Sequence, residues 1–474
     1  MEIESLMELA LSHAKSLGAS YADIRYESAH SESCGAEDGQ PKEASRSFDE
    51  GFGIRGLAGG SWGFSSINGG EDTKKDVLFD AVAIAVGNSK ATARGSKKIT
   101  LEPACYCGKY KTNVKKDPFK VPLEDTMTGC VEATKQMGKV NDVAKAFAGV
   151  GYEKVHKVFY STDGSKIEQD QTYLLASTTA VASANGITEY YSTTEGGQKG
   201  YEALTIGYDM QDDAIETAKK AVELVNAKSP KPYDTNVVID PDGLALIVHE
   251  ISGHPCEADR ILGWEAAWAG TAWWQDMAGQ KIGSDYVNIV SDASIPGYLG
   301  SYGFDDEGTP AQKITHLKNG VLTGFMHTRQ TAAIMGVKPN GAARATAHTF
   351  APIVRMTNTY MEAGDWKKDE IIEDTKDGVY FCGMHTPSID SRRYNFQISC
   401  RIAYEIKDGE IGKPLRGVSI MGTADKFWAS VDAAADDVEM RPVANCGKGD
   451  PMQTCMVGNG GPHIRAKGKI VGVA

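Results

Sequence analysis

The stretch that decides the organisation of this chain reads Asp240-Pro241-Asp242-Gly243-Leu244-Ala245-Leu246-Ile247-Val248-His249-Glu250-Ile251-Ser252-Gly253-His254-Pro255-Cys256-Glu257-Ala258-Asp259. Asp240 is a good N-cap and Pro241 suits the first helical position, so a helix is expected to begin there. The apolar run that follows predicts that this helix is buried. Two histidines and a glutamate at its end are costly to desolvate unless something binds them. A metal ion is the natural occupant.

The two histidines are five positions apart, one more than in the H-E-x-x-H helix of many zinc enzymes. On a regular α-helix, side chains five positions apart point about 140° away from each other. A π-type widening, which closes residue i onto i+5, would bring both imidazoles to one ion, and Gly253 and Pro255 mark a place where the helix can yield. We therefore expect a distorted or terminating helix at His254. The competing interpretation treats His249 and His254 as satisfied polar residues at a helix end, and Glu250 as a surface charge.

Composition excludes several classes of protein. The chain has 474 residues, of which 41% are hydrophobic and 24% charged, as in globular proteins with two or three domains. A net charge of −13 disfavours a nucleic-acid partner, because such binding needs clustered Lys and Arg. The tryptophan-rich stretch 264–274 is far shorter than the roughly 20 apolar residues of a membrane span, so no membrane segment is expected. The chain start does not read as a signal peptide, and nine scattered cysteines do not form a disulfide framework, which indicates a reducing cytoplasm.

Hydrophobic periodicity predicts helices and strands in the N-terminal half. Helices are expected over 3–17, 72–87, 123–148 and 212–227. Strands are expected over 21–26, 51–64, 155–160 and 166–183, with tight turns at Gly59-Gly60 and Asp163-Gly164. The polar, basic stretch 90–116 reads as an exposed connection, in which Cys105 and Cys107 are only a weak metal signal.

The segment Ser229-Pro230-Lys231-Pro232 cannot continue a helix, because each residue before a proline is pushed out of the α region. The main domain boundary is therefore expected there. We expect an α+β fold with a small N-terminal α+β unit over 1–110 and a second α/β unit over 111–230. A C-terminal domain over 231–474 is expected to be mostly β and to carry one metal-binding helix.

The motif in the opening stretch has the form H-E-x-x-G-H-x-x-E-x-D, and further landmarks follow it in order. They are Phe304-Asp305-Asp306-Glu307-Gly308-Thr309-Pro310, Leu317-Lys318-Asn319-Gly320, Thr357-Asn358 with Gly364-Asp365, Asp377-Gly378-Val379-Tyr380, Tyr404-Glu405-Ile406-Lys407-Asp408-Gly409 and Cys446-Gly447-Lys448. From Asp242 onward the chain resembles the TldD/PmbA family of peptide-maturation metalloproteases, also described as modulators of DNA gyrase, on its TldD-like side. The N-terminal half fits the same family more loosely.

The resemblance implies a set of metal ligands. It makes His249 and His254 zinc ligands, Glu250 the general base and Cys446 the third ligand. The residues alone leave the choice between Cys446 and Cys455 open, since both lie in glycine-rich strand-turn sequence. A thiolate would complete a tetrahedron with two imidazoles and leave the fourth position for water.

Other polar residues near the motif are assigned less directly. Glu257 and Asp259 are expected to orient the imidazoles, the alternative being ordinary acids on a helix surface. Cys256 follows His254 by two residues and is expected to point elsewhere. The stretch 264–268, with tryptophan at both ends, departs from the family pattern of Ser or Thr followed by an aromatic residue. The acidic stretch 305–307 is expected to form a turn rather than a second metal site.

The function implied by the resemblance is zinc-dependent hydrolysis of unfolded or extended peptides. The family places its active site inside a dimer chamber, so the partner is either a second copy, giving a homodimer, or a PmbA-like paralogue, giving a heterodimer. One alternative is another zinc hydrolase, such as a dipeptidase. A second alternative is an inactive assembly partner, which would hold no zinc.

Overall fold

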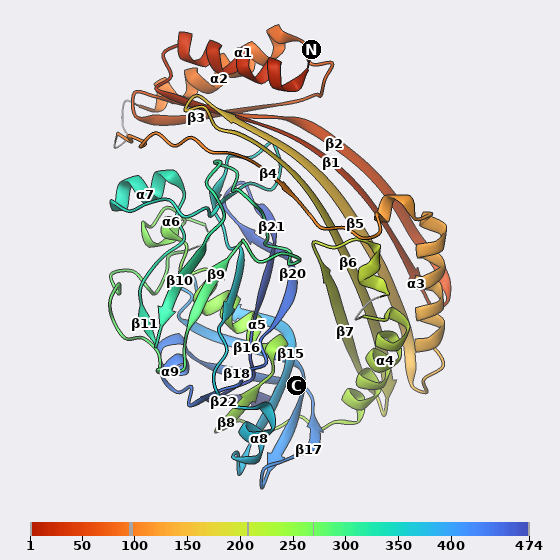
Figure 1. Cartoon of the computed structure of the whole chain (residues 1–474). Coiled ribbons are helices and arrows are strands. Elements are labelled where there is room, and N and C mark those ends of the chain that lie inside the picture. Colours follow the sequence, from red (N-terminus) through yellow and green to blue (C-terminus); the bar gives the residue numbers. More distant parts are fainter. Residues whose placement is uncertain (1, 94–97, 206–207, 269, 473–474) are drawn as a thin grey trace.

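The computed structural model describes residues 2–93, 98–205, 208–268 and 270–472. Figure 1 shows an N-terminal part, in which long curved strands arch over a compact C-terminal part. The chain combines helices with predominantly antiparallel sheets, which confirms the expected α+β class with a mostly β C-terminal region. Among the described residues, no helix is long and apolar enough to cross a membrane.

One seven-stranded sheet extends through both expected N-terminal units. Its strands are β1 (Tyr21–Glu37), β2 (Gln40–Ala58), β3 (Ser61–Asn68), β4 (Cys107–Lys111), β5 (Val143–Ser161), β6 (Lys166–Ala184) and β7 (Ile187–Gly197). They lie in the order β3-β2-β1-β5-β6-β4, with β7 also paired to β6. The predicted turns at Gly59-Gly60 and Asp163-Gly164 are both confirmed, because β2 passes into β3 and β5 into β6 at these points. The strand predicted over 21–26 continues to Glu37, because β2 and β5 pair with it along its length.

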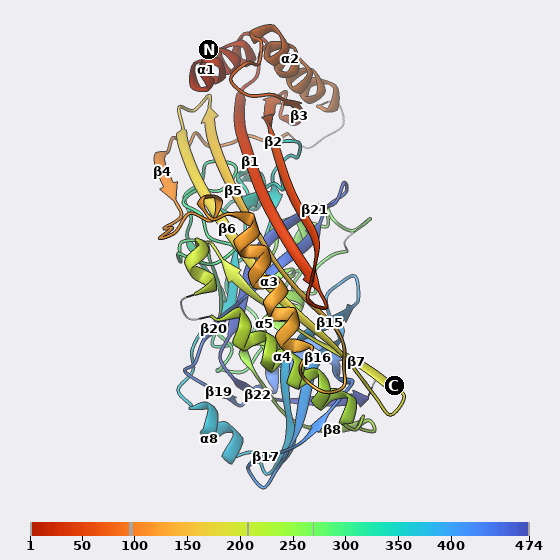
Figure 2. The same cartoon turned by 90° about the vertical axis from the view of Figure 1, so that its right-hand side faces the viewer.

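Four helices cover the N-terminal sheet. They are α1 (Ile3–Ser16), α2 (Lys75–Thr92), α3 (Leu123–Met137) and α4 (Met210–Asn226). Figure 2 shows α1 and α2 at one end of the sheet and α3 and α4 in front of it, with the C-terminal part behind. The prediction of one helix over 123–148 was wrong at its end, since α3 stops at Met137 and β5 starts at Val143. Ala146 and Ala148 favour helix intrinsically, but here they are buried between β1 and β6, and sheet pairing overrides their propensity.

The C-terminal part begins after Pro232 with β8 (Tyr233–Ile239), beyond the expected linker. One sheet contains β8, β15 (Asp377–Ile389), β16 (Asn395–Lys407), β17 (Glu410–Leu415), β18 (Val418–Thr423), β19 (Ala433–Ala434) and β22 (Ile464–Gly472). Because β15 pairs with both β8 and β16, the strands β15, β8, β22, β18 and β16 form a closed ring of pairings.

A second C-terminal sheet has the strand order β11-β10-β9-β14-β21-β20. Its strands are β9 (Ile289–Asp292), β10 (Lys313–Lys318), β11 (Val321–Leu322), β14 (Asn358–Met361), β20 (Glu439–Lys448) and β21 (Gln453–Gly461). A separate short pair joins β12 (Ala343–Arg344) to β13 (Ile353–Val354). The smaller helices of this part are α6 (Ala258–Ile261), α7 (Arg329–Met335), α8 (Lys368–Glu373) and α9 (Ala424–Ala429).

Helix α5 (Pro241–Val248) lies between the two C-terminal sheets, in contact with β15 on one side and β20 and β21 on the other. The Asp240 carboxylate accepts the N–H of Gly243 at 2.6 Å, so the predicted N-cap is confirmed. The helix residues from Leu244 to Val248 are all buried. This apolar embedding carries the histidine-containing end of the helix into the interior of the domain.

Candidate metal centre

The chain leaves the regular helix geometry at His249. Residues His249–Gly253 form a π-helical turn, in which the His254 N–H donates to the His249 carbonyl at 3.1 Å. The expected widening of the helix is therefore confirmed. Gly253 packs closely here, because a Cβ atom at this position would lie 2.2 Å from the sulfur of Met356, whose side chain would have to move.

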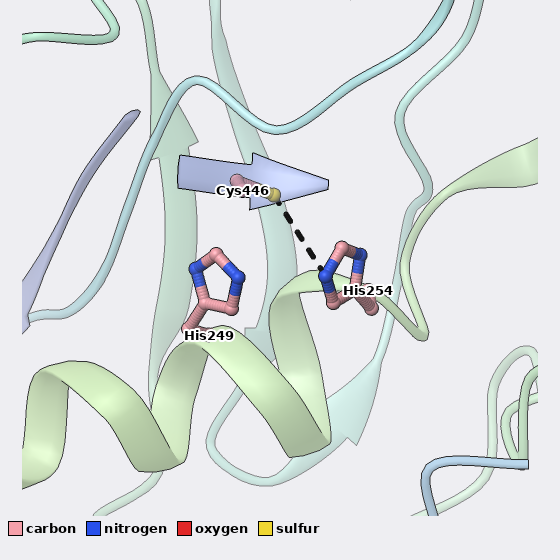
Figure 3. Close-up of side chains that lie close together, drawn as sticks. All are labelled: His249, His254 and Cys446. Atoms are coloured by element: carbon pink, nitrogen blue, oxygen red, sulfur yellow. Dashed lines mark hydrogen bonds between the residues drawn. The ribbon is translucent and has the colours of Figure 1, made fainter. Parts of the chain in front are cut away.

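The widened turn brings the two imidazoles together, and a distant strand adds a thiol. The rings of His249 and His254 are 4.9 Å apart and nearly perpendicular, and Cys446 Sγ lies 3.8 Å from His254 Nε2. One ligand atom from each of the three residues lies within 4.8 Å of the others. Figure 3 shows Cys446 on its strand above the turn, opposite both rings. All three side chains are buried, so the group faces little competition from bulk water.

The same geometry favours one of the two candidate cysteines, Cys446 and Cys455, as the third ligand. Cys455 on β21 is paired directly opposite Cys446 on β20, yet only Cys446 belongs to the group with the histidines. The pairing of β20 with β21 is irregular between Val443 and Cys446, as in a β-bulge, which re-aims side chains. Arg355 then fixes this backbone, because its guanidinium donates to the carbonyl groups of Cys446 and Gln453.

Each imidazole is oriented through its second nitrogen. His249 Nδ1 donates to the Asn459 side-chain oxygen at 2.9 Å, while the Asn459 amide group donates to the Thr359 carbonyl. His254 Nδ1 lies 2.9 Å from a carboxylate oxygen of Glu257. Both Nε2 atoms therefore remain available toward Cys446, which is the arrangement that metal-binding histidines usually have.

Glu257 and Asp259 are part of a buried charge cluster. Lys448 Nζ lies 2.6 Å from Asp259 and 3.3 Å from Glu257, and Arg260 Nε also donates to Glu257. Glu257 contacts an imidazole as expected. Asp259 accepts hydrogen bonds from Lys448 and from the Arg260 N–H instead. It therefore does not contact an imidazole directly, and Lys448 connects it to Glu257. Both acids are buried, so neither is an exposed acid on a helix surface.

Electrostatics favour a cation at the three donors. Burial raises the pKa of a thiol, but His249 and His254 hold the pKa of Cys446 well below its usual range. Burial lowers the pKa of His249, but Cys446 raises it to about 9. These directions favour the thiolate form of Cys446, which is the form that binds a metal cation.

Glu250 projects from the same turn toward an arginine that the sequence did not reveal. Burial raises its pKa, but Arg393, His249 and His254 lower it, so the carboxylate is charged. Arg393 Nη1 forms an ion pair with Glu250 Oε2. Arg393 lies 143 residues away in the chain, and no local pattern connects the two.

The remaining candidates lie outside the group. Cys256 Sγ donates to the Gly253 carbonyl at 2.9 Å and points away from the donors, as expected. Asp305 caps its own turn by accepting the N–H groups of Glu307 and Thr309, which confirms the turn. Cys105 and Cys107 are exposed and belong to no metal-ligand group in the described part of the chain.

Three family models match consecutive parts of the chain. The PmbA/TldA metallopeptidase domain 1 matches residues 22–89, the central domain 116–228 and the C-terminal domain 232–472. The chain belongs to the PmbA/TldA metallopeptidase family. The TldD/PmbA resemblance is thus confirmed, and the π-turn, Cys446 and Lys448 all lie within the family's C-terminal domain.

Relatives of this PmbA/TldA member share nearly its whole length. "Metalloprotease MJ0996" of Methanocaldococcus jannaschii is 31% identical, covering 98% of both chains. "Zinc metalloprotease TldD homolog" of Saccharolobus solfataricus is 27% identical, covering 97% of this chain and 98% of its own. Among solved structures, TldE from Thermococcus kodakarensis has a TM-score of 0.79 at 17% identity, covering 98% of this chain and 100% of its own. A Thermotoga maritima protein proposed to modulate a DNA gyrase has a TM-score of 0.81 at 18% identity, with 99% and 100% covered. The two structures support the fold alone.

Proposed function

We propose that this protein is a zinc-dependent peptidase that hydrolyses unfolded or extended peptides. One observation carries the proposal: the donors of His249, His254 and Cys446 converge within 4.8 Å, and Glu250 lies on the same turn. The metalloprotease names of its full-length relatives support a hydrolytic role.

The donor set suits zinc. Two imidazoles and one thiolate are ligands that zinc accepts in tetrahedral geometry, leaving one position open. Asn459 and Glu257 contact the Nδ1 atoms of the two histidines and so fix which nitrogen of each ring faces Cys446. When bound there, zinc supplies a Lewis acid that polarises a carbonyl group and makes water more acidic.

Glu250 is the proposed general base. Its Oε2 is held by Arg393, and among the described residues its Oε1 accepts no hydrogen bond. Oε1 is therefore the atom that would take a proton from the attacking water. The same carboxyl group would then give the proton to the leaving amine.

Burial of the centre supports a preference for unfolded substrates. His249, Glu250 and His254 are only 4%, 8% and 2% exposed, so a folded domain cannot approach them closely. We therefore expect a substrate to reach them only as a single extended chain. Peptide bonds in tightly folded proteins should therefore resist cleavage.

Assembly is proposed as a homodimer or as a heterodimer with a PmbA-like paralogue. Residues 40–49 of β2 are exposed, and β3 pairs with β2 only from Gly51 onward. An unpaired strand edge of this length is a template for pairing with another chain. The structural similarity to TldE supports a related chain as the partner.

A cytoplasmic location is proposed from the nine cysteines, which are all free thiols.

The proposal is tested by metal analysis and peptide digestion. The purified protein is expected to hold about one zinc per chain and to cleave an unstructured peptide. Chelator should abolish cleavage, and added zinc should restore it. Zinc without cleavage of any peptide would contradict a peptidase, and absence of zinc would favour an inactive assembly partner.

A further inference from the structure

The turn between β15 and β16, residues 390–394, reaches the π-helical turn, and its Arg393 side chain contacts Glu250. The two side chains are mostly buried, at 18% and 10% exposed, and they form a direct ion pair. Neither residue belongs to the candidate ligand group. The pair therefore joins the proposed base to an element far away in the sequence.

The turn that carries Arg393 is rigidly built. The Asp390 carboxylate accepts backbone N–H groups from Arg392, Tyr394 and Asn395, at 3.1, 2.9 and 3.0 Å. Arg393 itself has a φ of 62°. This left-handed conformation is unfavourable for a residue with a long side chain, and such strain persists mainly where the side chain has a role.

A second element fastens the turn to the metal-binding helix. The Trp273 backbone N–H donates to the Arg392 carbonyl at 2.8 Å, and its indole N–H donates to the Ile251 carbonyl at 3.0 Å. Gly270 packs so closely on Ser391 that a Cβ atom would lie 1.8 Å from the Ser391 carbonyl oxygen. Trp273 thus links the backbone of the π-helical turn to the turn that carries Arg393.

The two oxygens of the Glu250 carboxylate have different surroundings. Arg393 holds Oε2, and in the described part of the chain Oε1 accepts no hydrogen bond. We propose that Arg393 is a positioning residue: it fixes the Glu250 carboxylate so that Oε1 faces the attacking water. This inference rests on the proposed peptidase function. It adds Arg393 to the residues that catalysis requires beyond the proposed zinc ligands and Glu250.

Kinetics of three variants test the positioning role. Arg393→Gly removes the guanidinium while relieving the left-handed backbone, so the variant should fold and keep its zinc. Its kcat should fall roughly 10–100-fold, as when a catalytic group is misplaced by about 1 Å, with KM changing less than about threefold. Arg393→Lys should recover part of the loss, and so should guanidinium ion added to Arg393→Gly.

The neighbouring residue is the matched control. The Arg392 side chain is exposed and makes no hydrogen bond or ion pair with the described residues, so Arg392→Ala should keep the wild-type kcat. A higher KM with unchanged kcat in Arg393→Gly would overturn the inference, because Arg393 would then act on the substrate. An equal loss of kcat in Arg392→Ala would overturn it too, since net charge alone would explain both.

A measurement without metal or substrate tests the contact itself. Thermal midpoints of the metal-free protein are compared for Glu250→Gln, Arg393→Gln and the double variant. If the pair forms, the double variant should lose clearly less than the sum of the single losses. Additive losses in an active enzyme would overturn this inference alone. A zinc-loaded wild type that cleaves no peptide would overturn the proposed function, and this inference with it.

Discussion

Two parts of the molecule each bring three potential metal-ligand side chains within 4.8 Å of one another, yet the two groups differ in burial and in partners. His249, His254 and Cys446 are buried at the end of α5, whereas a second group on β5 and β6 is only half-buried. That group consists of His156, Glu168 and Asp170, whose ligand atoms also lie within 4.8 Å of one another.

The side chains of the surface group already have polar partners without a metal ion. His156 Nδ1 lies 2.9 Å from Asp170, and Glu168 pairs with the exposed Lys109 at 2.5 Å. In the buried group, the two histidines hold the pKa of Cys446 well below its usual range against the effect of burial, and the second nitrogen of each imidazole has a polar partner. Short distances between donors alone do not identify a metal site, whereas burial and fixed donor orientation support the proposed centre.

The largest effect is expected at the buried thiol. Cys446→Ser replaces a soft ligand with a hydroxyl, so zinc should be lost and hydrolysis should fall by roughly three orders of magnitude or more. Zinc content and peptide cleavage are measured together. Cys455→Ser is the matched control, since it lies directly opposite on β21 and should keep both. The reverse result would show that the ligand is Cys455.

Glu250→Gln should separate chemistry from binding within the same centre. The side chain keeps its shape but loses its basicity, so zinc should stay near one per chain while kcat falls by about 10²–10⁴. Metal analysis and steady-state kinetics on one preparation measure both. Full activity in this variant would rule out Glu250 as the base.

Glu257→Gln tests whether the surroundings of the donors matter. Burial alone raises the pKa of Glu257, but Lys448, His254 and Arg260 hold it well below its usual range. The variant leaves the buried Lys448 and Arg260 poorly compensated, so the unfolding free energy should fall by about 3–5 kcal/mol, and zinc affinity by about 10–100-fold. Urea unfolding and zinc titration measure the two effects.

The same residue gives a pH dependence with a definite sign. A carboxylate with a lowered folded pKa stabilises the fold at neutral pH, and this stabilisation declines only as pH drops below the unfolded value, about 4.3. The difference between wild type and Glu257→Gln should therefore be constant from pH 8 to about 5 and shrink in stronger acid. Glu362→Gln, which breaks an exposed ion pair with Lys313, should cost less than about 1 kcal/mol throughout.

The smallest effect is expected at the surface group. His156→Ala should leave zinc content and activity unchanged and cost less than about 1 kcal/mol of unfolding free energy, as for exposed ion pairs. Zinc per chain and urea unfolding are again the measurements. A drop from two zinc ions per chain to one would show that proximity alone had made a second site.

The sequence could predict the local parts of the centre. The five-residue spacing of the histidines, with Gly253 between them and Pro255 beyond, predicted the widened turn, because helix geometry depends on neighbouring residues. Asp240 likewise predicted where the helix begins. Both features depend on contacts within a few positions of the chain.

Contacts from distant residues could not be predicted, and the distant Cys446 was expected only through the family resemblance. Asn459 reaches His249 across 210 residues, Lys448 reaches Asp259 across 189, and Arg393 reaches Glu250 across 143. Asn459 and Arg393 lie outside every motif of the sequence, and Lys448, although it belongs to the Cys446-Gly447-Lys448 landmark, had no predicted partner. The predicted helix over 123–148 was too long for the same reason. Residues 143–148 form a strand because they pair with β1 and β6, which come from other parts of the chain.

The position of Cys446 has a consequence for biosynthesis. It lies 192 residues beyond His254, and ribosomes add about 5–20 residues per second. A growing chain would therefore carry both histidines for roughly 10–40 s before the thiol exists. During that interval β20 is absent, and the three donors of the proposed centre cannot assemble. For the proposed peptidase, the order of translation would therefore delay proteolytic competence until β20 has been synthesised.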